Sequence, residues 1–576
     1  MRRRLPDIAA AAVAPLALAV AAALVHPTGE FPISDDFDFA ATAFDLARYG
    51  EVRLSDWPAM TLVAHAAWGA TFVRIFGESH FVLRIATLAL AAAAVVAAYA
   101  WVRQCGATRT ASVFAALFVA LNPMFLAYAC TFMTDVAGCA GLIVLLAVLT
   151  ATWRTERTAA WCGIGALASV AYLVRQVAVL PVFVALTAMM FVGRWRTAFA
   201  LGLPLAVTAG AHWWWLNAVH GVPFNALRPT IRPELLFDAP ELGRRLLRLV
   251  MTTGLWIAPA TISWLSWLRR REWLLAASGA AAVVILALMM PDAVRPYNDE
   301  VVHDLGVGVG LPFRRGDALR GPELALLGQR PSLFQLATVG LAAVSLGILV
   351  ALAPRLRIAF RASSPGWRLG AATLAGLIAF ALLSAAFYER YLMPVFLLTG
   401  IMLLMTLPGR PSSAARTALA AFAAFGVVGL QDDFCRRRVV WEALEALRKS
   451  GIPADKIDGG PEFFLQHVFN PAYRGRPRRV RPWLGQVKNW TGHDPARSRL
   501  IAAMAADPLG APSSSRPYKA ALKSEPGWTI VSSTRYQSWL RSGEVLILRR
   551  SQPSSPPDTS RNGRPLFDHF RFPLLA

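Results

Sequence analysis

The chain has 576 residues, of which 56% are hydrophobic and 16% are charged, whereas charged residues make up roughly 25% of an average soluble domain. Long apolar stretches recur at short intervals, which predicts an α-helical protein with many membrane spans and excludes an ordinary soluble domain. The net charge of +23 does not indicate nucleic-acid binding, because most arginines lie in short connections between apolar stretches, where membrane topology places them.

The apolar stretches predict about thirteen membrane spans. Several of them are barely long enough to cross ~30 Å of hydrocarbon. The first stretch also fits a signal peptide, because it has a basic start and a short apolar core. The predicted spans are 7–25, 79–102, 108–122, 133–153, 158–174, 176–193, 197–217, 251–268, 273–290, 333–353, 367–387, 391–408 and 414–431.

The arginines orient these spans. With a cytoplasmic N-terminus, every second connection is short and basic, as the positive-inside rule requires of the inner side. An odd number of spans then places the C-terminal region outside. The sequence therefore predicts an integral multi-pass protein of the inner or plasma membrane, with an extracytoplasmic C-terminal domain. The inner connections begin at the basic N-terminus and include residues 103–109, 154–157, 194–196, 269–271, 355–368 and 410–416.

Three outer loops are long. The loop 26–78 predicts a short helix from Ser34 to Arg48 and a second helix from Trp57 to Phe76, which is too polar to span and is suited to lie flat at the interface. The loop 218–250 ends in a basic amphipathic stretch, 240–248, that suits anionic headgroups. The loop 291–332 is rich in Gly and Pro and predicts a flexible lid.

The chain divides into three parts: a membrane domain (1–432), an extracytoplasmic soluble α/β domain (433–550) and a disordered tail (551–576). In the soluble domain the pattern predicts a helix at 438–450 and two strands at 527–531 and 544–548. Five cysteines show no metal-ligand spacing, and Cys435 is the one cysteine of this region, so no disulfide is predicted there.

Asp35, Asp36 and Asp38 place three carboxylates within four residues at the start of the first outer loop. A structural explanation is that Ser34 caps a helix and the acids complement its dipole. A catalytic explanation is that an acid pair at the outer face acts on a lipid-borne substrate. The two are compatible, and substitution by Asn separates them, because Asn can cap a helix but cannot accept a proton.

Asp135 lies at the outer end of the fourth predicted span, where an aspartate facing lipid is costly. It therefore either faces a protein interior or belongs to a helix start capped by Thr131 or Thr134. Arg175 breaks the rule that outer connections lack arginine, so it either snorkels to the interface or binds phosphate.

Arg390 is a second arginine at a predicted outer connection, and Tyr391 follows it directly. An ion pair with Glu389 or another neighbour is the structural alternative. His220, His303 and Asp304 lie in outer loops without ligand spacing, so we expect structural roles for them and predict no metal site. No nucleotide-binding or zinc motif is recognised in the sequence.

In order and spacing, these elements resemble GT-C glycosyltransferases, and more narrowly family 39, which includes protein O-mannosyltransferases and aminoarabinose–lipid A transferases. The resemblance covers most of residues 1–432. It rests on Asp35-Asp36 with Phe39-Ala40, on Leu121-Asn122-Pro123 with Thr131-Phe132-Met133-Thr134-Asp135, and on Arg390-Tyr391-Leu392-Met393-Pro394.

The resemblance implies an inverting transfer of a sugar from a polyprenyl-phosphate donor to a glycan, lipid or protein at the outer face. It implies that Asp35, or Asp36 in a register shifted by one, is the base and that Asp135 orients the acceptor, positions the base or helps to bind a metal. Arg175 or Arg390 stabilises the leaving phosphate, and Tyr391 contacts substrate. A divalent cation stays open as a cofactor, and Phe37-Asp38 departs from the family pattern, which leaves the donor sugar and acceptor open.

Two other classes compete with a transferase. A transporter or flippase of a lipid-linked glycan would require ionisable groups near mid-span and paired repeats, and neither is evident in the sequence. A structural or assembly protein would tolerate Asn at both Asp35 and Asp135.

Overall fold

The computed structural model describes residues 5–227, 230–289, 331–362, 364–385, 387–459, 461–470, 500–506, 528–539 and 542–550. The tail predicted at 551–576 lies outside the described residues. The loop predicted at 291–332, with His303 and Asp304, also lies outside them, apart from its last two residues.

Helices dominate the described chain, as the apolar stretches predict. The described α-helices up to Lys449 are α1 (Leu5–Val25), α2 (Asp36–Tyr49), α3 (Val63–Phe76), α4 (His80–Gln104), α5 (Arg109–Ala120), α6 (Pro123–Ala129), α7 (Thr134–Thr152), α8 (Thr158–Val174), α9 (Leu180–Phe191), α10 (Trp195–Trp214), α11 (Ala239–Trp256), α12 (Ala258–Ile262), α13 (Arg270–Met289), α15 (Pro331–Ala362), α16 (Pro365–Leu383), α17 (Met393–Met405) and α18 (Ser413–Lys449).

Seven helices of the described chain are long and apolar enough to cross a membrane, or up to nine if each of two bent pairs counts as one span. The multi-pass membrane fold is therefore confirmed. The number is smaller than the thirteen predicted by at least four. Helix α10 has 20 residues but is not among the helices that qualify, and α8, α9 and α17 have only 17, 12 and 13 residues. These last three helices fall short of the ~20 residues that a helix typically needs to cross the bilayer alone.

The two bent pairs have local causes. The chain turns by 58° between α5 and α6, where Asn122 accepts hydrogen bonds from the backbone N–H of Met124 and Phe125 and Pro123 begins the new helix. A second bend of 62° follows α11. Helix α11 begins at Ala239, where Asp238 caps it, and ends at Trp256. The span predicted at 251–268 is therefore divided between α11 and α12.

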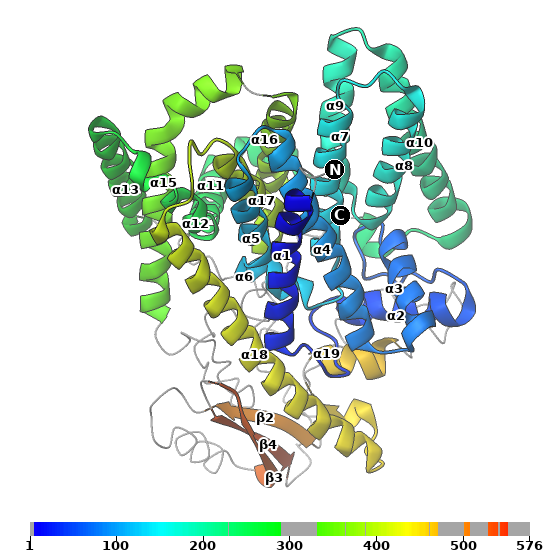
Figure 1. The fold of residues 1–576 in the computed structure, drawn as a ribbon. Coiled ribbons are helices and arrows are strands. Elements are labelled where there is room, and N and C mark those ends of the chain that lie inside the picture. The colour runs from blue at the N-terminus through cyan, green and yellow to red at the C-terminus, as the bar shows by residue number, and fades with distance from the viewer. Residues whose placement is uncertain are drawn as a thin grey trace.

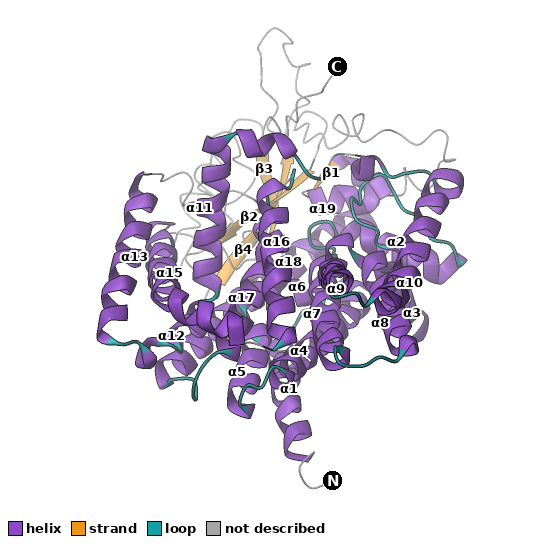
Figure 2. Cartoon of the chain, turned by 90° about the horizontal axis from the view of Figure 1, so that it is seen from above, coloured by secondary structure: helices purple, strands orange, loops and turns teal. Residues whose placement is uncertain are grey.

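The helices form one packed layer (Figures 1 and 2). Helices α13 and α15 lie side by side at one edge of this layer, and α8, α9 and α10 lie at the opposite edge. Apolar side chains at the outer surface of both edges are exposed, among them Phe191 and Leu288. An apolar side chain that faces outward from a membrane helix contacts lipid rather than water, so these two edges are lipid-facing surfaces.

Helix α18 connects the helical layer to a small sheet (Figure 1). It continues without a break to Lys449, so the helix predicted at 438–450 is its final part and the predicted boundary at 432 falls inside it. The sheet has the order β1-β2-β4-β3. The predicted strands are β3 (Trp528–Gln537) and β4 (Ser542–Arg550), and they pair antiparallel. Strands β1 (Ile457–Asp458) and β2 (Leu500–Ala506) were not predicted.

The sheet, α2, α3 and the short helix α19 (Pro461–Phe464) lie at the same end of the helical layer (Figure 1). The two helices predicted in the first loop are both present, although the second begins at Val63 rather than at Trp57. Residues 50–62 between them run largely without helix. The candidate site described next is built at this end.

Candidate active site

The first acid of the cluster pairs with an arginine from the far end of the membrane domain. Asp35 immediately precedes α2, and Arg390 lies in the 3₁₀ turn Glu389–Leu392 before α17. Nη2 of Arg390 donates to Oδ2 of Asp35 over 3.0 Å, and the two side chains are 10% and 24% exposed. Arg390 thus reaches a partner 355 positions away in the sequence, a pairing that the sequence did not suggest.

The second acid pairs in the same way with the other exceptional arginine. Nη1 of Arg175 donates to Oδ1 of Asp135 over 2.6 Å, and the Asp135 side chain is 2% exposed. Arg175 lies between α8 and a 3₁₀ turn, and its aliphatic part packs close to Gly138 of α7. Arg175 is therefore held inside the protein and does not snorkel to a lipid interface.

Tyr391 joins the two ion pairs into one cluster. Its ring centroid lies 4.9 Å from the guanidinium carbon of Arg175 and 5.5 Å from that of Arg390. Both distances are within the range of cation–π attraction. We call Asp35, Arg390, Tyr391, Arg175 and Asp135 the paired-acid cluster. It gathers one carboxylate that is open to solvent, one that is enclosed, and two fixed cations.

Asp36 is buried, whereas the adjacent Asp35 is partly exposed. Asp36 is 1% exposed, and its two carboxylate oxygens accept hydrogen bonds from the backbone N–H of Ile33 (2.6 Å) and Phe132 (3.3 Å). Burial raises the pKa of Asp36 to about 7, although Arg84 and the two N–H donors act in the opposite direction. The Asp36 carboxyl thereby ties the first loop to the connection between α6 and α7.

The side-chain caps that the structural explanations require are absent, although Asp36 and Asp135 do lie in the first turns of α2 and α7, where acids complement the helix dipole. Ser34 has a φ of +56° and lies outside the helix, and Asp35, at the residue before α2, makes no side-chain capping bond. Met133 precedes α7 and also makes none, while the Thr131 hydroxyl accepts from the Met133 N–H. The acids at both helix starts are therefore used for contacts between segments.

The sequence analysis missed Trp57. Its indole Nε1 donates to Oδ1 of Asp35 over 3.0 Å, on the oxygen that Arg390 does not contact. Trp57 was predicted as the first residue of a helix, whereas it lies in the non-helical stretch before α3. The one signal in the sequence is the Trp57-Pro58 pair, because a residue before proline favours extended backbone over helix.

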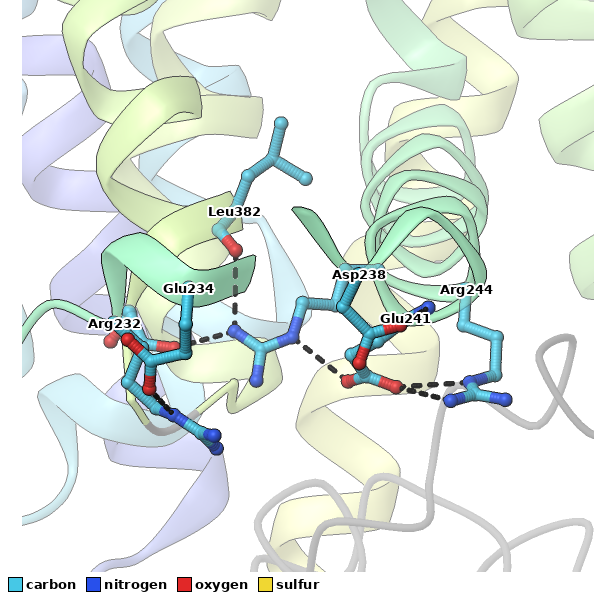
Figure 3. A network of polar contacts seen from close by, with 8 residues as sticks. Arg232, Glu234, Asp238, Glu241, Arg244 and Leu382 are labelled. Atoms are coloured by element: carbon cyan, nitrogen blue, oxygen red, sulfur yellow. Dashed lines mark hydrogen bonds and ion pairs between the residues drawn. The ribbon is translucent and has the colours of Figure 1, made fainter. Parts of the chain in front are cut away.

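The segment that carries Arg390 is anchored at its start by a buried arginine (Figure 3). Arg245 of α11 donates from Nη1 to the carbonyl oxygens of Ser384 (2.5 Å) and Leu382 (3.3 Å), at the C-terminal end of α16. Its Nε donates to Glu241, one turn earlier. A cation at the carbonyl end of a helix satisfies acceptors that the helix leaves open.

The prediction that stretch 240–248 faces anionic headgroups is wrong for Arg245, which is 6% exposed and lies inside the protein. Arg244 is exposed and pairs with Glu241, and Arg232 pairs with Glu234 beside it (Figure 3).

Among the described residues, no group of three or more His, Cys, Asp or Glu side chains is placed to hold an ion. His220, which lies at the end of a π-helical turn, accepts a hydrogen bond at Nε2 from the Leu54 N–H (3.0 Å). Its Nδ1 lies 2.8 Å from the Gly221 carbonyl oxygen. Both ring nitrogens are used to hold loops together.

Comparison with known families adds to this geometry. Residues 63–215 match the model of the dolichyl-phosphate-mannose-protein mannosyltransferase family. The match runs from the start of α3 to the end of α10. It includes Asp135 and Arg175, and it leaves out Asp35, Arg390 and Tyr391. In this part of the chain the match is to protein mannosyltransferases, which belong to the group of families that the motifs resemble.

Solved structures of similar proteins include ArnT from Cupriavidus metallidurans in the apo state, with a TM-score of 0.44 and 14% identity over 94% of this chain and 98% of that one. The same enzyme bound to undecaprenyl phosphate gives a TM-score of 0.41 and 15% identity over the same shares. The arabinofuranosyltransferase AftD from Mycobacteria gives 0.33 and 14% identity, over 94% of this chain and 40% of that one. These are distant likenesses, and no curated protein sequence matches.

Proposed function

We propose that this protein transfers a sugar from a polyprenyl-phosphate donor to an acceptor at the outer face of the membrane, with inversion at the anomeric carbon. The observation that carries this proposal is the paired-acid cluster. It places a partly exposed carboxylate, Asp35, beside Arg390, and the Tyr391 ring connects Arg390 to a second arginine, Arg175, that Asp135 holds. The family match over residues 63–215 supports the same class of reaction.

Asp35 acts as the general base in this proposal. Each of its oxygens accepts one hydrogen bond, from Trp57 or from Arg390, and a carboxylate oxygen has two lone pairs. One lone pair on each oxygen is therefore left to accept the proton of an acceptor hydroxyl. As that proton moves to Asp35, the acceptor oxygen bonds to the anomeric carbon and the bond from that carbon to the lipid phosphate breaks.

The arginines stabilise the leaving group. Negative charge grows on the lipid phosphate as its bond to the sugar breaks, and a fixed guanidinium nearby lowers the energy of that state. Arg390 is the stronger candidate, because it is adjacent to the base. Asp135 holds Arg175 in place by an ion pair, and Arg175 adds a second positive charge 4.9 Å from the centre of the Tyr391 ring.

The topology that accompanies this proposal is the one that the arginines predict. The membrane domain of residues 1–432 carries the site, the domain 433–550 lies outside the membrane, and residues 551–576 follow as a tail. The paired-acid cluster lies at the end of the helical layer where α2, α3 and the sheet are found (Figure 1), which is the outer end in this topology.

The test is the cellular pool of polyprenyl-phosphate sugars, measured by mass spectrometry of lipid extracts. Cells that carry Asp35→Asn at native protein level should accumulate one lipid-linked sugar, which names the donor. The matched control is Glu51→Gln, an exposed acid of the same loop that pairs with Arg53, and its pool should equal the native one. Unchanged pools in Asp35→Asn cells with well-folded protein would overturn the proposal and favour a flippase.

A further inference from the structure

Trp57 is the second partner of the Asp35 carboxylate. Its indole N–H holds Oδ1 at 3.0 Å while Arg390 holds Oδ2 at the same distance. A carboxylate that is bound at both oxygens by donors from different segments has one orientation. Without the indole, the carboxylate is free to turn both oxygens toward the planar guanidinium of Arg390, which favours two parallel bonds. That arrangement leaves fewer lone pairs for an acceptor hydroxyl.

Trp57 is itself held from two sides. Its ring meets Phe37 edge-on, with centroids 5.1 Å apart, and Phe469 at 6.4 Å. Its backbone carbonyl accepts a hydrogen bond of 2.6 Å from the side-chain amide of Asn225. Each of these contacts comes from a different part of the chain: the start of α2, the C-terminal region and the loop after α10. The indole is therefore fixed by tertiary packing rather than by its own segment.

The contact from the C-terminal region is a built interface. Phe469 ends a π-helical turn, Leu465–Phe469, and is fully buried with Phe37 and Leu465. The next residue, Asn470, donates from its amide to the backbone carbonyl of Phe37 over 3.1 Å. A segment that follows the whole membrane domain in the sequence thus covers the first turn of α2, directly beside Asp35.

We propose that Trp57 is a positioning residue for Asp35, and that Phe469 and Asn470 of the C-terminal region hold Trp57 in place. The C-terminal region is then part of the active unit rather than an appended binding module. This inference rests on the proposed function, because it assigns to Trp57 the task of directing the base. It adds that the orientation of Asp35 depends on a segment more than four hundred residues away.

The first variant is Trp57→Phe in the full-length protein, which keeps an aromatic ring and removes the N–H donor. The rate is measured in native-like vesicles, using as donor the polyprenyl-phosphate sugar that accumulates in Asp35→Asn cells. We expect kcat to fall roughly tenfold to a hundredfold, since small misplacements of catalytic groups cost this much. The KM for the donor should change by less than about twofold, because Trp57 orients the base and does not bind the lipid.

The matched control is Trp68→Phe. Trp68 lies in α3 of the same loop, and its indole donates to the Ala86 carbonyl over 2.8 Å, so this variant loses an equivalent hydrogen bond away from the cluster. Its kcat should stay within about twofold of native. Stoichiometric binding of undecaprenyl phosphate counts the folded sites in each sample, so that a loss of folded protein is not read as a loss of kcat.

The second variant tests the C-terminal segment. Phe469→Leu should lower kcat about threefold to tenfold, while Phe463→Leu should leave it within about twofold, because Phe463 is equally buried but packs on Trp441 and His467. In the double variant Trp57→Phe/Phe469→Leu the losses should be smaller than the product of the two single losses. Residues that act through one shared group are non-additive, whereas two independent defects multiply.

The outcomes separate the two proposals. If Asp35→Asn cells accumulate no lipid-linked sugar, the proposed function fails and this inference fails with it. If they accumulate one and Trp57→Phe turns over at the native rate, the proposed function stands and the role of Trp57 is refuted. Multiplicative losses in the double variant would refute the role of the C-terminal segment alone.

Discussion

The two ion pairs of the cluster use the same chemistry in two different surroundings. Asp35 and Arg390 meet with a quarter of the carboxylate side chain open, whereas Asp135 is 2% exposed beside Arg175. An enclosed ion pair has lost its water and depends on its partner. A partly open one keeps a lone pair that another molecule can reach. We therefore propose chemistry for the first pair and support for the second. Three predictions test this comparison, and a fourth concerns the neighbouring Asp36.

The largest effect is expected for Asp35→Asn. This change removes the proposed base but keeps the size of the side chain, so the transfer rate should fall by roughly 10²- to 10⁴-fold, as is typical for loss of a general base. The initial rate of sugar transfer in vesicles measures it. The apparent melting temperature should stay within a few degrees of native, because Asp35 is partly exposed. Native turnover in this variant would contradict the assignment.

Asp135→Asn should act first on the fold. It leaves the Arg175 guanidinium enclosed without its carboxylate, which costs about 3–5 kcal/mol. The yield of folded protein and the apparent melting temperature are the measurements. The double variant Asp135→Asn/Arg175→Met removes the stranded charge and should recover part of the loss. If Asp135→Asn is as stable as native but inactive, Asp135 belongs to the chemistry and the comparison between the pairs fails.

Arg390→Lys sharpens the role of the exposed pair. Lysine keeps the positive charge but lacks the planar fork of donors and contacts Asp35 and a phosphate less specifically. The transfer rate should fall about tenfold, equal to ~1.4 kcal/mol, with little change in melting temperature. Arg175→Lys serves as the comparison, because it should lower the melting temperature more than the rate per folded molecule. Identical profiles for the two variants would show that the pairs are equivalent.

The smallest effect concerns Asp36. Its pKa of about 7 in the folded protein lies above its ordinary value of 3.8, so the folded state binds a proton that the unfolded state releases at lower pH. Raising the pH through this range therefore favours unfolding. The apparent melting temperature should fall by a few degrees between pH 5 and pH 8, and Asp36→Asn should reduce that dependence. A melting temperature that rises with pH in the native protein would contradict the burial of a protonated Asp36.

The helical membrane architecture could be predicted from the sequence, because an apolar run long enough to leave water must bury its own backbone polar groups as a helix. The span count could not, since α9 and α17 have only 12 and 13 residues although the apolar stretches predicted at 176–193 and 391–408 are longer. The same holds for α18, where polar residues after 432 indicate a domain boundary while the helix continues to Lys449.

The members of the paired-acid cluster could also be singled out one by one. Asp35, Asp135, Arg175 and Arg390 are charges at the borders of apolar segments, where an unpartnered charge is costly. What the sequence left open was whether Asp35 or Asp36 is the exposed acid. The two are adjacent in the sequence, and they differ in the tertiary structure, where Asp36 is buried and accepts a hydrogen bond from the backbone N–H of Phe132.

From the sequence alone it follows that the chain is a multi-pass membrane protein and that certain charged residues require a special explanation, because hydropathy and charge act locally along the chain. The tertiary structure alone decided how these residues pair, which acid stays open to solvent and that Trp57 contacts it. The pairing of Asp35 with Arg390 closes a loop of 355 positions, and such a contact depends on how all the intervening helices pack.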